Sequence, residues 1–472
     1  MKKVPIYEML KNYSEKHPLP FHMPGHILGR GLNGQLKMAG ELDITEIPGA
    51  DCLHSPDGVI KEAQALAAEC FGADYTLFMV NGSTSGIHAM IGAVVKPGGK
   101  LIVGRDCHVS VLNALAMFKA EPVFVLPEVD KIHGISLGVS YEAFENALRA
   151  NPDVQGILVT SPNYYGISLN LRKIAELAEG YRVPLLVDEA HGAHFRFYEK
   201  FPEPAISSGA DLCVQSLHKT LPALTQTALL HGKKKGLVDR KRVEKIASMV
   251  QTTSPSYVLM ASMDIARDIM EALGKDLYHE LWLNIKDFEC KLQNTAITRV
   301  TPKEDIKYDF SRIVLSFKNT ALTGLKAGEI LFEKYGIVAE MADLYNVVLI
   351  ATPYHKKEDF EGLLIALEEI SKDYPKDKNS PETTLYWPNL LPEKVLSIHE
   401  ALYYKVEEVP IKEAVGSVCG ASIVPYPPGI PILNAGEKVT GEIAQYLVSI
   451  LDMGYRVNNV NNGRIPILNG RY

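Results

Sequence analysis

Two apolar segments near the middle of the chain each end in a residue that could do chemistry. Asp188 ends the run 185–187, and Lys219 follows the run 212–217. A lysine at a strand end is partly desolvated, which favours the neutral amine that attacks a carbonyl. A carboxylate beside a pyridine nitrogen keeps that nitrogen protonated, so that the ring accepts electrons. The pair therefore predicts a site for pyridoxal 5'-phosphate, with Lys219 forming a Schiff base to the cofactor aldehyde.

A turn rich in glycine and hydroxyl residues supplies a candidate phosphate site. Residues 81–86 read Asn-Gly-Ser-Thr-Ser-Gly, between a predicted strand and an amphipathic stretch. The backbone amides and the hydroxyls of this turn would lie at a helix N-terminus, where a phosphate is favoured. Such turns also occur without a ligand. The sequence contains neither GxxxxGK[ST] nor a GxGxxG motif after a strand, so a nucleotide loop is disfavoured.

Several histidines are further candidates. His108 follows the predicted strand 101–103, where its ring could stack on a cofactor, although a purely structural histidine is the alternative. His22 and His26, together with His191 and His194, could be metal ligands. Pro24 and Gly25 disfavour a helix between the first two, so we predict no metal site.

A literal match to a helicase signature occurs at residues 188–191, Asp-Glu-Ala-His. The chain lacks a phosphate-loop lysine motif, and its net charge of −7 is not that of a nucleic-acid-binding surface. We therefore expect no nucleic-acid partner. The acidic balance suits a cationic small substrate, and it equally suits plain solubility.

The composition predicts a soluble protein. Hydrophobic residues make up 46% and charged residues 22%, which are ordinary values for a globular chain. The six cysteines show no CxxC or zinc-type spacing, as expected of free thiols in a reducing cytoplasm. No apolar run approaches the roughly 18 residues of a membrane span, and no signal peptide is recognisable. We therefore expect a cytoplasmic location and no membrane partner.

Residues 60–230 alternate short apolar runs with amphipathic stretches, which implies a largely parallel sheet covered by helices on both faces. In such sheets ligands bind beyond the carboxyl ends of the strands, where residues 81–86, Asp188 and Lys219 fall. The predicted strands are 76–80, 101–103, 123–126, 156–160, 185–187 and 212–215.

A second mixed region, residues 263–370, contains the strand-like runs 313–317 and 347–350. The polar, proline-containing stretch 371–381 has no periodicity and is typical of a linker. The segment 425–431, Pro-Tyr-Pro-Pro-Gly-Ile-Pro, is too rigid for a helix and is expected to form a structured loop.

Taken in order and spacing, these residues resemble the ornithine/lysine/arginine decarboxylase family of fold-type-I pyridoxal-phosphate enzymes. The resemblance covers nearly the whole chain. It is carried by Phe21-His22-Met23-Pro24-Gly25-His26, Ser161-Pro162-Asn163-Tyr164-Tyr165-Gly166, His218-Lys219-Thr220-Leu221, Thr252-Thr253-Ser254-Pro255, and the segment 425–431 followed by Gly436-Glu437. One departure is Ile27-Leu28-Gly29, where members commonly carry a lysine. The motifs begin near residue 22, so we expect a short form without the N-terminal wing domain.

The resemblance implies an α/β, aminotransferase-like fold of type I, with a mostly parallel central sheet, a smaller α/β domain and a C-terminal α+β domain. The expected domains are an N-terminal arm (1–40), a cofactor-binding large domain (41–262), a small domain (263–370), a linker (371–390) and a C-terminal decarboxylase domain (391–472).

The resemblance also implies roles for individual residues. Lys219 carries the cofactor, Asp188 pairs with the pyridine nitrogen, and His191 lies beside the Schiff base. The remaining expected contacts are His108 stacked on the ring, Ala190 beneath it, Ser83, Thr84, Ser216 and His218 on the phosphate, Thr252 reaching the phosphate of the neighbouring subunit, and Glu437 or Asp51 near the distal cation of the substrate.

The implied reaction is decarboxylation of a basic L-amino acid. Arginine, which gives agmatine and carbon dioxide, is favoured over lysine and ornithine. The role of Thr252 implies a homodimer with shared active sites. Two alternatives stay open: an aminotransferase or lyase on the same fold, for which Arg312 would clamp the substrate α-carboxylate, and a catalytically silent relative that binds cofactor or polyamine.

Overall fold

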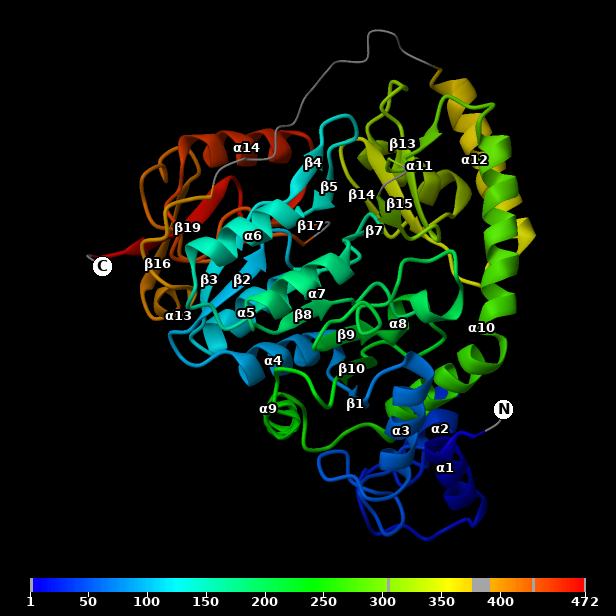
Figure 1. Ribbon diagram of the computed structural model, residues 1–472. Coiled ribbons are helices and arrows are strands. Elements are labelled where there is room, and N and C mark those ends of the chain that lie inside the picture. Colours follow the sequence, from blue (N-terminus) through cyan, green and yellow to red (C-terminus); the bar gives the residue numbers. More distant parts are fainter. Residues whose placement is uncertain (1–2, 304–305, 376–390, 427–428, 471–472) are drawn as a thin grey trace. The chain divides into compact units, whose positions relative to one another are not determined.

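The structure, a computed structural model, describes residues 3–303, 306–375, 391–426 and 429–470. It divides into a first unit, Met1–Val94 with Leu171–Leu277, and a second unit, Val95–Asn170 with Tyr278–Tyr472. Figure 1 shows the elements of both. Within the described residues, no helix has both the length and the hydropathy that a membrane span requires.

The first unit is built on four neighbouring strands (Figure 1). In spatial order they are β1 (Tyr75–Met79), β10 (Ala228–Gly232), β9 (Leu212–Ser216) and β8 (Leu185–Asp188). Strands β8 and β9 are parallel, whereas β10 runs antiparallel to β9 and to β1. The predictions for β1, β8 and β9 are confirmed to within one residue. Strand β10 was not predicted.

Helices of the first unit cover both faces of these strands. Gly86 of α4 approaches the face that carries Val214 so closely that an added Cβ would lie 2.4 Å from the valine Cγ2. On the other face, Phe71 of α3 stacks on His231 of β10, with ring centroids 5.2 Å apart. The helices are α1 (Pro5–Glu15), α2 (Gln35–Gly40), α3 (Val59–Phe71), α4 (Gly82–Val94), α7 (Leu171–Gly180), η1 (Phe195–Phe197), α8 (Leu217–Thr220), α9 (Arg240–Val250) and the start of α10 (Tyr257–Leu292).

In the second unit, β2 (Lys100–Gly104) pairs in parallel with β3 (Glu121–Val125) and with β6 (Ile157–Thr160). The predicted mostly parallel sheet is thus confirmed, with β10 as the antiparallel member. Associated elements are α5 (Val109–Met117), α6 (Tyr141–Ala150), the hairpin β4 (Glu128–Asp130) and β5 (Ile135–Gly138), and the pair β7 (Ile167–Ser168) and β12 (Lys307–Tyr308).

The second unit also contains an antiparallel sheet that confirms the predicted smaller α/β part. Its strands, in spatial order, are β11 (Thr298–Arg299), β13 (Arg312–Ser316), β15 (Asn346–Ile350) and β14 (Met341–Ala342). Helices α11 (Gly324–Tyr335) and α12 (Lys357–Asp373) follow β13 and β15 in the chain. The predicted linker 371–390 begins inside α12, and its residues 376–390 lie outside the described part.

The C-terminal part is α+β, as expected. Helix α14 buries Ile443, Leu447 and Ile450 in a core shared with Ile423 and Leu433. Its elements are α13 (Ile398–Ala401), β16 (Lys405–Pro410) paired with β19 (Arg464–Asn469), β17 (Val424–Tyr426) paired with β18 (Arg456–Asn458), and α14 (Gly441–Asp452). The predicted loop 425–431 starts within β17, and residues 427–428 are outside the described part.

Candidate active site

Most of the predicted cofactor residues lie at or just beyond the carboxyl ends of neighbouring strands in the first unit. Met79 at the end of β1 pairs with Ala228, which pairs with Ser216 at the end of β9. Asp188 lies opposite Val214, two residues before Ser216. The segments that continue from β1, β8 and β9 therefore leave the strands at the same edge, as expected for a ligand site in such a sheet.

Lys219 and His191 are in direct contact at this edge. The Lys219 Nζ lies 3.0 Å from His191 Nε2, within hydrogen-bonding distance. The lysine sits in the short helix α8 and is half-buried, whereas His191 is buried in the turn that follows β8. An amine and an imidazole at this distance can exchange a proton.

Asp188 presents a buried carboxylate beside the same turn. Its side chain is at the end of β8 with only 3% of its surface exposed. The backbone N–H of Ala190 donates to Asp188 Oδ1 over 3.2 Å. The carboxylate is thus held against the turn that also carries His191.

Ser216 is a buried hydroxyl that fits a phosphate ligand. Its Oγ is buried and has no hydrogen-bond partner among the described residues. A buried polar atom without a partner costs roughly 1–3 kcal/mol, so a position of this kind fits an oxygen-rich ligand. Ser83 and Thr84, in the first turn of α4, lie beyond the same end of β1. These residues fit the phosphate of pyridoxal phosphate.

His218 and Thr252 have further contacts at this edge. The His218 Nδ1 lies 3.0 Å from the carbonyl oxygen of Thr227. Burial lowers the pKa of His218, the Thr227 carbonyl opposes this effect, and the Lys219 charge adds to it. The backbone N–H of Thr252 donates to Asn81 Oδ1 over 3.0 Å, which ties Thr252 to the predicted phosphate turn.

His108 belongs to the second unit, where it is the residue before helix α5. Its Nδ1 lies 2.8 Å from Ser110 Oγ and accepts a weaker hydrogen bond from the Ser110 backbone N–H. An added Cβ on Gly429 would lie 3.9 Å from the His108 ring, so the C-terminal segment passes beside the imidazole.

Glu437 is already engaged in the interior of the second unit. Its Oε1 accepts from Arg105 Nη1 over 2.9 Å, and its Oε2 accepts from Arg105 Nη2 over 2.7 Å. The backbone and side-chain nitrogens of Asn434 also donate to this carboxylate. A substrate cation would have to share Glu437 with these donors, and its role toward substrate stays a prediction.

Asp51 caps the start of helix α3. Its carboxylate accepts hydrogen bonds from backbone N–H groups of Cys52, Asp57, Gly58, Ile60 and Lys61. Burial acts to raise the pKa of Asp51, but the amides of Asp57 and Cys52 outweigh it and the pKa is lowered. The Asp51 side chain thus has a structural use, and its substrate role also stays a prediction.

Arg312, the residue that the aminotransferase alternative would need, lies on β13 with 2% of its surface exposed. Burial lowers the pKa of its guanidinium, while Asp309 opposes this effect. Its Cβ and Cγ pack beside Gly166.

The structure also reveals functional candidates that the motifs did not single out. Glu189, between Asp188 and Ala190, is 1% exposed, and burial raises the pKa of its carboxyl to about 7. Arg105 is a second case, since it is buried beside β2 with Glu437 as its partner. Each of them lies just after an apolar strand and next to an aspartate, Asp188 or Asp106, and this position was the only signal in the sequence.

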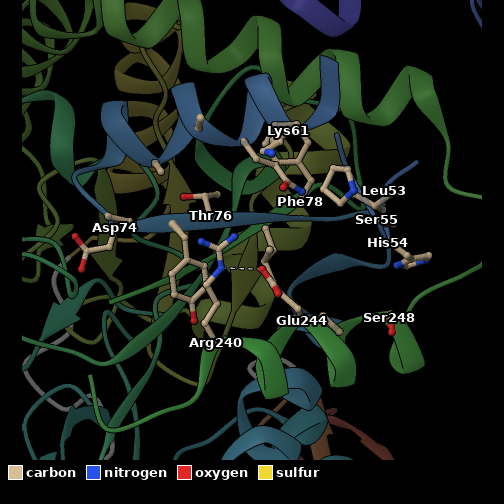
Figure 2. Close-up of a pocket in the computed structure, with 18 of the residues that line it drawn as sticks. Leu53, His54, Ser55, Lys61, Asp74, Thr76, Phe78, Arg240, Glu244 and Ser248 are labelled. Carbon is tan, nitrogen blue, oxygen red and sulfur yellow. Dashed lines mark hydrogen bonds and ion pairs between the residues drawn. The ribbon is translucent and has the colours of Figure 1, made fainter. Parts of the chain in front are cut away.

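A separate pocket of about 810 Å³ opens at the free edge of β1. Figure 2 shows Thr76 on β1, Lys61 on one side, and Arg240 with Glu244 on the other. The Arg240 Nε donates to Glu244 Oε1 over 2.7 Å. Among the described residues that line this pocket are Gln64, Tyr75 and Gln251, whereas Asp188 and Lys219 are not among them.

The chain is similar to known proteins in both sequence and fold. Residues 4–318 match the family described as "Orn/Lys/Arg decarboxylase, major domain", and residues 384–457 match its C-terminal domain. The chain is 36% identical to an arginine decarboxylase of Bacillus subtilis, over 99% of this chain and 97% of that one. It is 40% identical to an arginine decarboxylase of Halalkalibacterium halodurans, over 94% and 93% of the two chains.

Among solved structures, the constitutive lysine decarboxylase of E. coli has the same fold. The TM-score is 0.83 at 20% sequence identity, and the match covers 99% of this chain and 82% of that one.

Proposed function

Because the chain belongs to the Orn/Lys/Arg decarboxylase family, we propose that it decarboxylates a basic L-amino acid with pyridoxal phosphate held at Lys219. The observation that carries this proposal is the 3.0 Å contact between Lys219 Nζ and His191 Nε2. This contact lies beyond the carboxyl ends of β8 and β9, where Asp188 also lies. An amine, a proton acceptor and a buried carboxylate are the groups that this chemistry needs.

When bound, pyridoxal phosphate supplies an electron sink that stabilises negative charge at Cα as the bond to the carboxylate breaks. Lys219 would offer the amine to which the cofactor attaches. Asp188 would hold a proton on the pyridine nitrogen, and its burial would strengthen that interaction because the surroundings have a low dielectric constant. His191 accepts or returns a proton at Lys219 Nζ. Either residue can return a proton to Cα.

The phosphate would be held by Ser216, Ser83 and Thr84, with a contribution from His218. Ser216 Oγ is the best supported of these, since no described residue satisfies it. His108 would stack on the ring, and Ala190 would pack beneath it.

Arginine is proposed as the preferred substrate, with agmatine and carbon dioxide as products. The support is the two relatives named as arginine decarboxylases, at 36% and 40% identity over nearly the full chains. Lysine and ornithine are the other candidates, since the family description includes all three amino acids. Glu437 and Asp51 stay candidates for contact with the distal cation.

A homodimer is proposed as the active unit, with Thr252 directed toward the neighbouring site. Exposed apolar side chains in the N-terminal arm support a second copy as partner, because isolated chains seldom leave such residues in water. Phe21 is 93% exposed, and Leu19 and Met23 are also exposed. The cytoplasm is proposed as the location because the cysteines are free thiols.

The test is a product assay with purified protein and pyridoxal phosphate, using arginine, lysine and ornithine separately. We expect carbon dioxide and the matching amine, with the highest kcat/KM for arginine. A keto acid in place of carbon dioxide would instead identify an aminotransferase. Absence of carbon dioxide from all three, despite bound cofactor, would refute the proposed reaction.

A further inference from the structure

Four buried polar side chains form a continuous hydrogen-bonded chain in the first unit. Gln215 Nε2 donates to Glu189 Oε2 over 2.7 Å. Gln215 Oε1 lies 3.1 Å from His231 Nε2, and His231 Nδ1 lies 2.8 Å from Thr76 Oγ1. None of the four side chains is more than 4% exposed. We call these residues the Glu189 network.

Strand register explains why these side chains meet. Cys213 pairs with His231, which pairs with Thr76, so the three residues lie side by side on β9, β10 and β1. Because side chains alternate along a strand, these residues face α3, where Phe71 stacks on His231. Asp188 points to the opposite face. The Glu189 network therefore contacts the turn after β8 from the face of the sheet that α3 covers.

The hydrogen bonds of the network run in one direction. Glu189 accepts hydrogen bonds from three donors, because the Ala205 backbone N–H and the Cys213 thiol also donate to its carboxyl group. The Gln215 oxygen then faces His231 Nε2, so that nitrogen carries the proton and Nδ1 accepts from the Thr76 hydroxyl. Burial lowers the pKa of His231 to about 3, which keeps the ring neutral, as this arrangement requires.

We propose that the Glu189 network positions Asp188, by holding residues 188–190 in place at the proposed cofactor site. This inference rests on the proposed function. The backbone N–H of Glu189 donates to the Val214 carbonyl over 3.0 Å, and the Ala190 N–H donates to Asp188 Oδ1. Glu189 is thus fixed by its side chain and its backbone, and any rotation there would move Asp188 and Ala190 together.

The network ends at the pocket beside β1, since Thr76 lines it (Figure 2). This end offers a matched pair of variants. Thr76→Ser keeps the hydroxyl that donates to His231, whereas Thr76→Val keeps the shape and removes the hydroxyl. Glu189→Gln alters the other end of the network. An amide nitrogen would replace one carboxylate oxygen and would face a group that donates a hydrogen bond to Glu189.

The experiment measures amide hydrogen exchange of a peptide covering residues 185–192, with and without pyridoxal phosphate. We expect exchange about tenfold faster in Glu189→Gln and Thr76→Val, with Thr76→Ser close to wild type. In the loaded protein, Glu189→Gln should also weaken cofactor binding about tenfold, alter the circular dichroism of the bound cofactor, and lower kcat with little change in KM.

A merely structural role would give a different result. If Glu189→Gln only lowers the unfolding midpoint, and exchange and cofactor affinity match the exposed control Glu199→Gln, the inference is overturned. If Glu189→Gln does not fold, Thr76→Val is compared with Thr76→Ser instead. Equal amide exchange of residues 185–192 in these two variants overturns the inference. Exchange does not depend on turnover, so a protein that shows the expected exchange but releases no carbon dioxide refutes only the proposed function.

Discussion

Arg105 and Glu437 form a bidentate ion pair in the interior of the second unit, although they are 332 residues apart in the chain. Both side chains are buried, and the Arg105 guanidinium also lies over the Phe124 ring, 4.6 Å from its centroid. The pair joins the segment that leads to His108 with the C-terminal segment that contains Glu437. The Glu437 carboxylate, which the sequence predicts to contact the distal cation of the substrate, therefore also has a partner within the chain.

Removing one charge of the Arg105–Glu437 pair should lower the free energy of unfolding. Glu437→Gln leaves the Arg105 charge buried without its counter-ion, and we expect a loss of about 3 kcal/mol in the free energy of unfolding. The double variant Arg105→Met with Glu437→Leu removes both charges and should recover most of that loss. Urea unfolding measures both, with the exposed Glu413→Gln as the control. Equal stability of wild type and Glu437→Gln would contradict the role assigned to the pair.

Ser216→Ala should separate cofactor affinity from stability. Its Oγ is buried without a partner among the described residues. Its removal should therefore leave the cofactor-free protein as stable as before, or more stable by about 1 kcal/mol. Binding of pyridoxal phosphate should weaken about tenfold, as measured by absorbance titration. Unchanged affinity, matching that of the exposed control Ser55→Ala, would place the phosphate elsewhere.

Asp188→Asn should damage turnover far more than cofactor binding. A neutral amide cannot hold a proton on the pyridine nitrogen, so stabilisation of the transition state is lost. The expected fall in kcat is roughly 100-fold, from the loss of about 2.7 kcal/mol, with less than tenfold change in cofactor affinity. Steady-state kinetics on cofactor-saturated protein test this, with the exposed Asp276→Asn as control. A fall in affinity alone, with normal kcat at saturation, would argue against the assigned role.

The pH dependence of stability should carry a signature of His231. Burial lowers the pKa of this histidine from 6.5 to about 3 in the folded state. Between these values the unfolded chain binds a proton that the folded protein does not, so stability falls as the pH drops below about 6.5. The limiting slope is about 1.4 kcal/mol per pH unit.

His231→Gln should remove this contribution. The difference in unfolding free energy between wild type and variant should therefore shrink as the pH is lowered from 7 to 4.5. Parallel pH profiles for the two proteins would show that His231 is not buried in its neutral form.

The sequence predicted the elements that apolar runs define. Strands β8 and β9 were expected within one residue, and with them the position of Asp188 at a strand end. Lys219 was expected at the same sheet edge for the same reason. These inferences succeeded because a buried parallel strand is a continuous apolar run whose carboxyl end faces the ligand.

Contacts between distant segments could not be predicted in this way. Strand β10 ends in His231 and Gly232, so its short run carried no clear pattern, and its antiparallel direction has no local signal. Asp51 caps α3 from a loop eight residues before that helix begins, outside the spacing of a capping motif. The partnership of Arg105 and Glu437 depends on the tertiary fold alone.

The most direct test of the central claim is the release of labelled carbon dioxide from carboxyl-labelled arginine, by wild type and by Lys219→Ala, each supplied with pyridoxal phosphate. The proposed reaction at Lys219 requires label release equal to agmatine formed in wild type, and a loss of at least about 1000-fold in the variant, equivalent to about 4 kcal/mol. The exposed control Lys235→Ala should match wild type. No release by cofactor-bound wild type on arginine, lysine or ornithine, or equal release by Lys219→Ala, would contradict it.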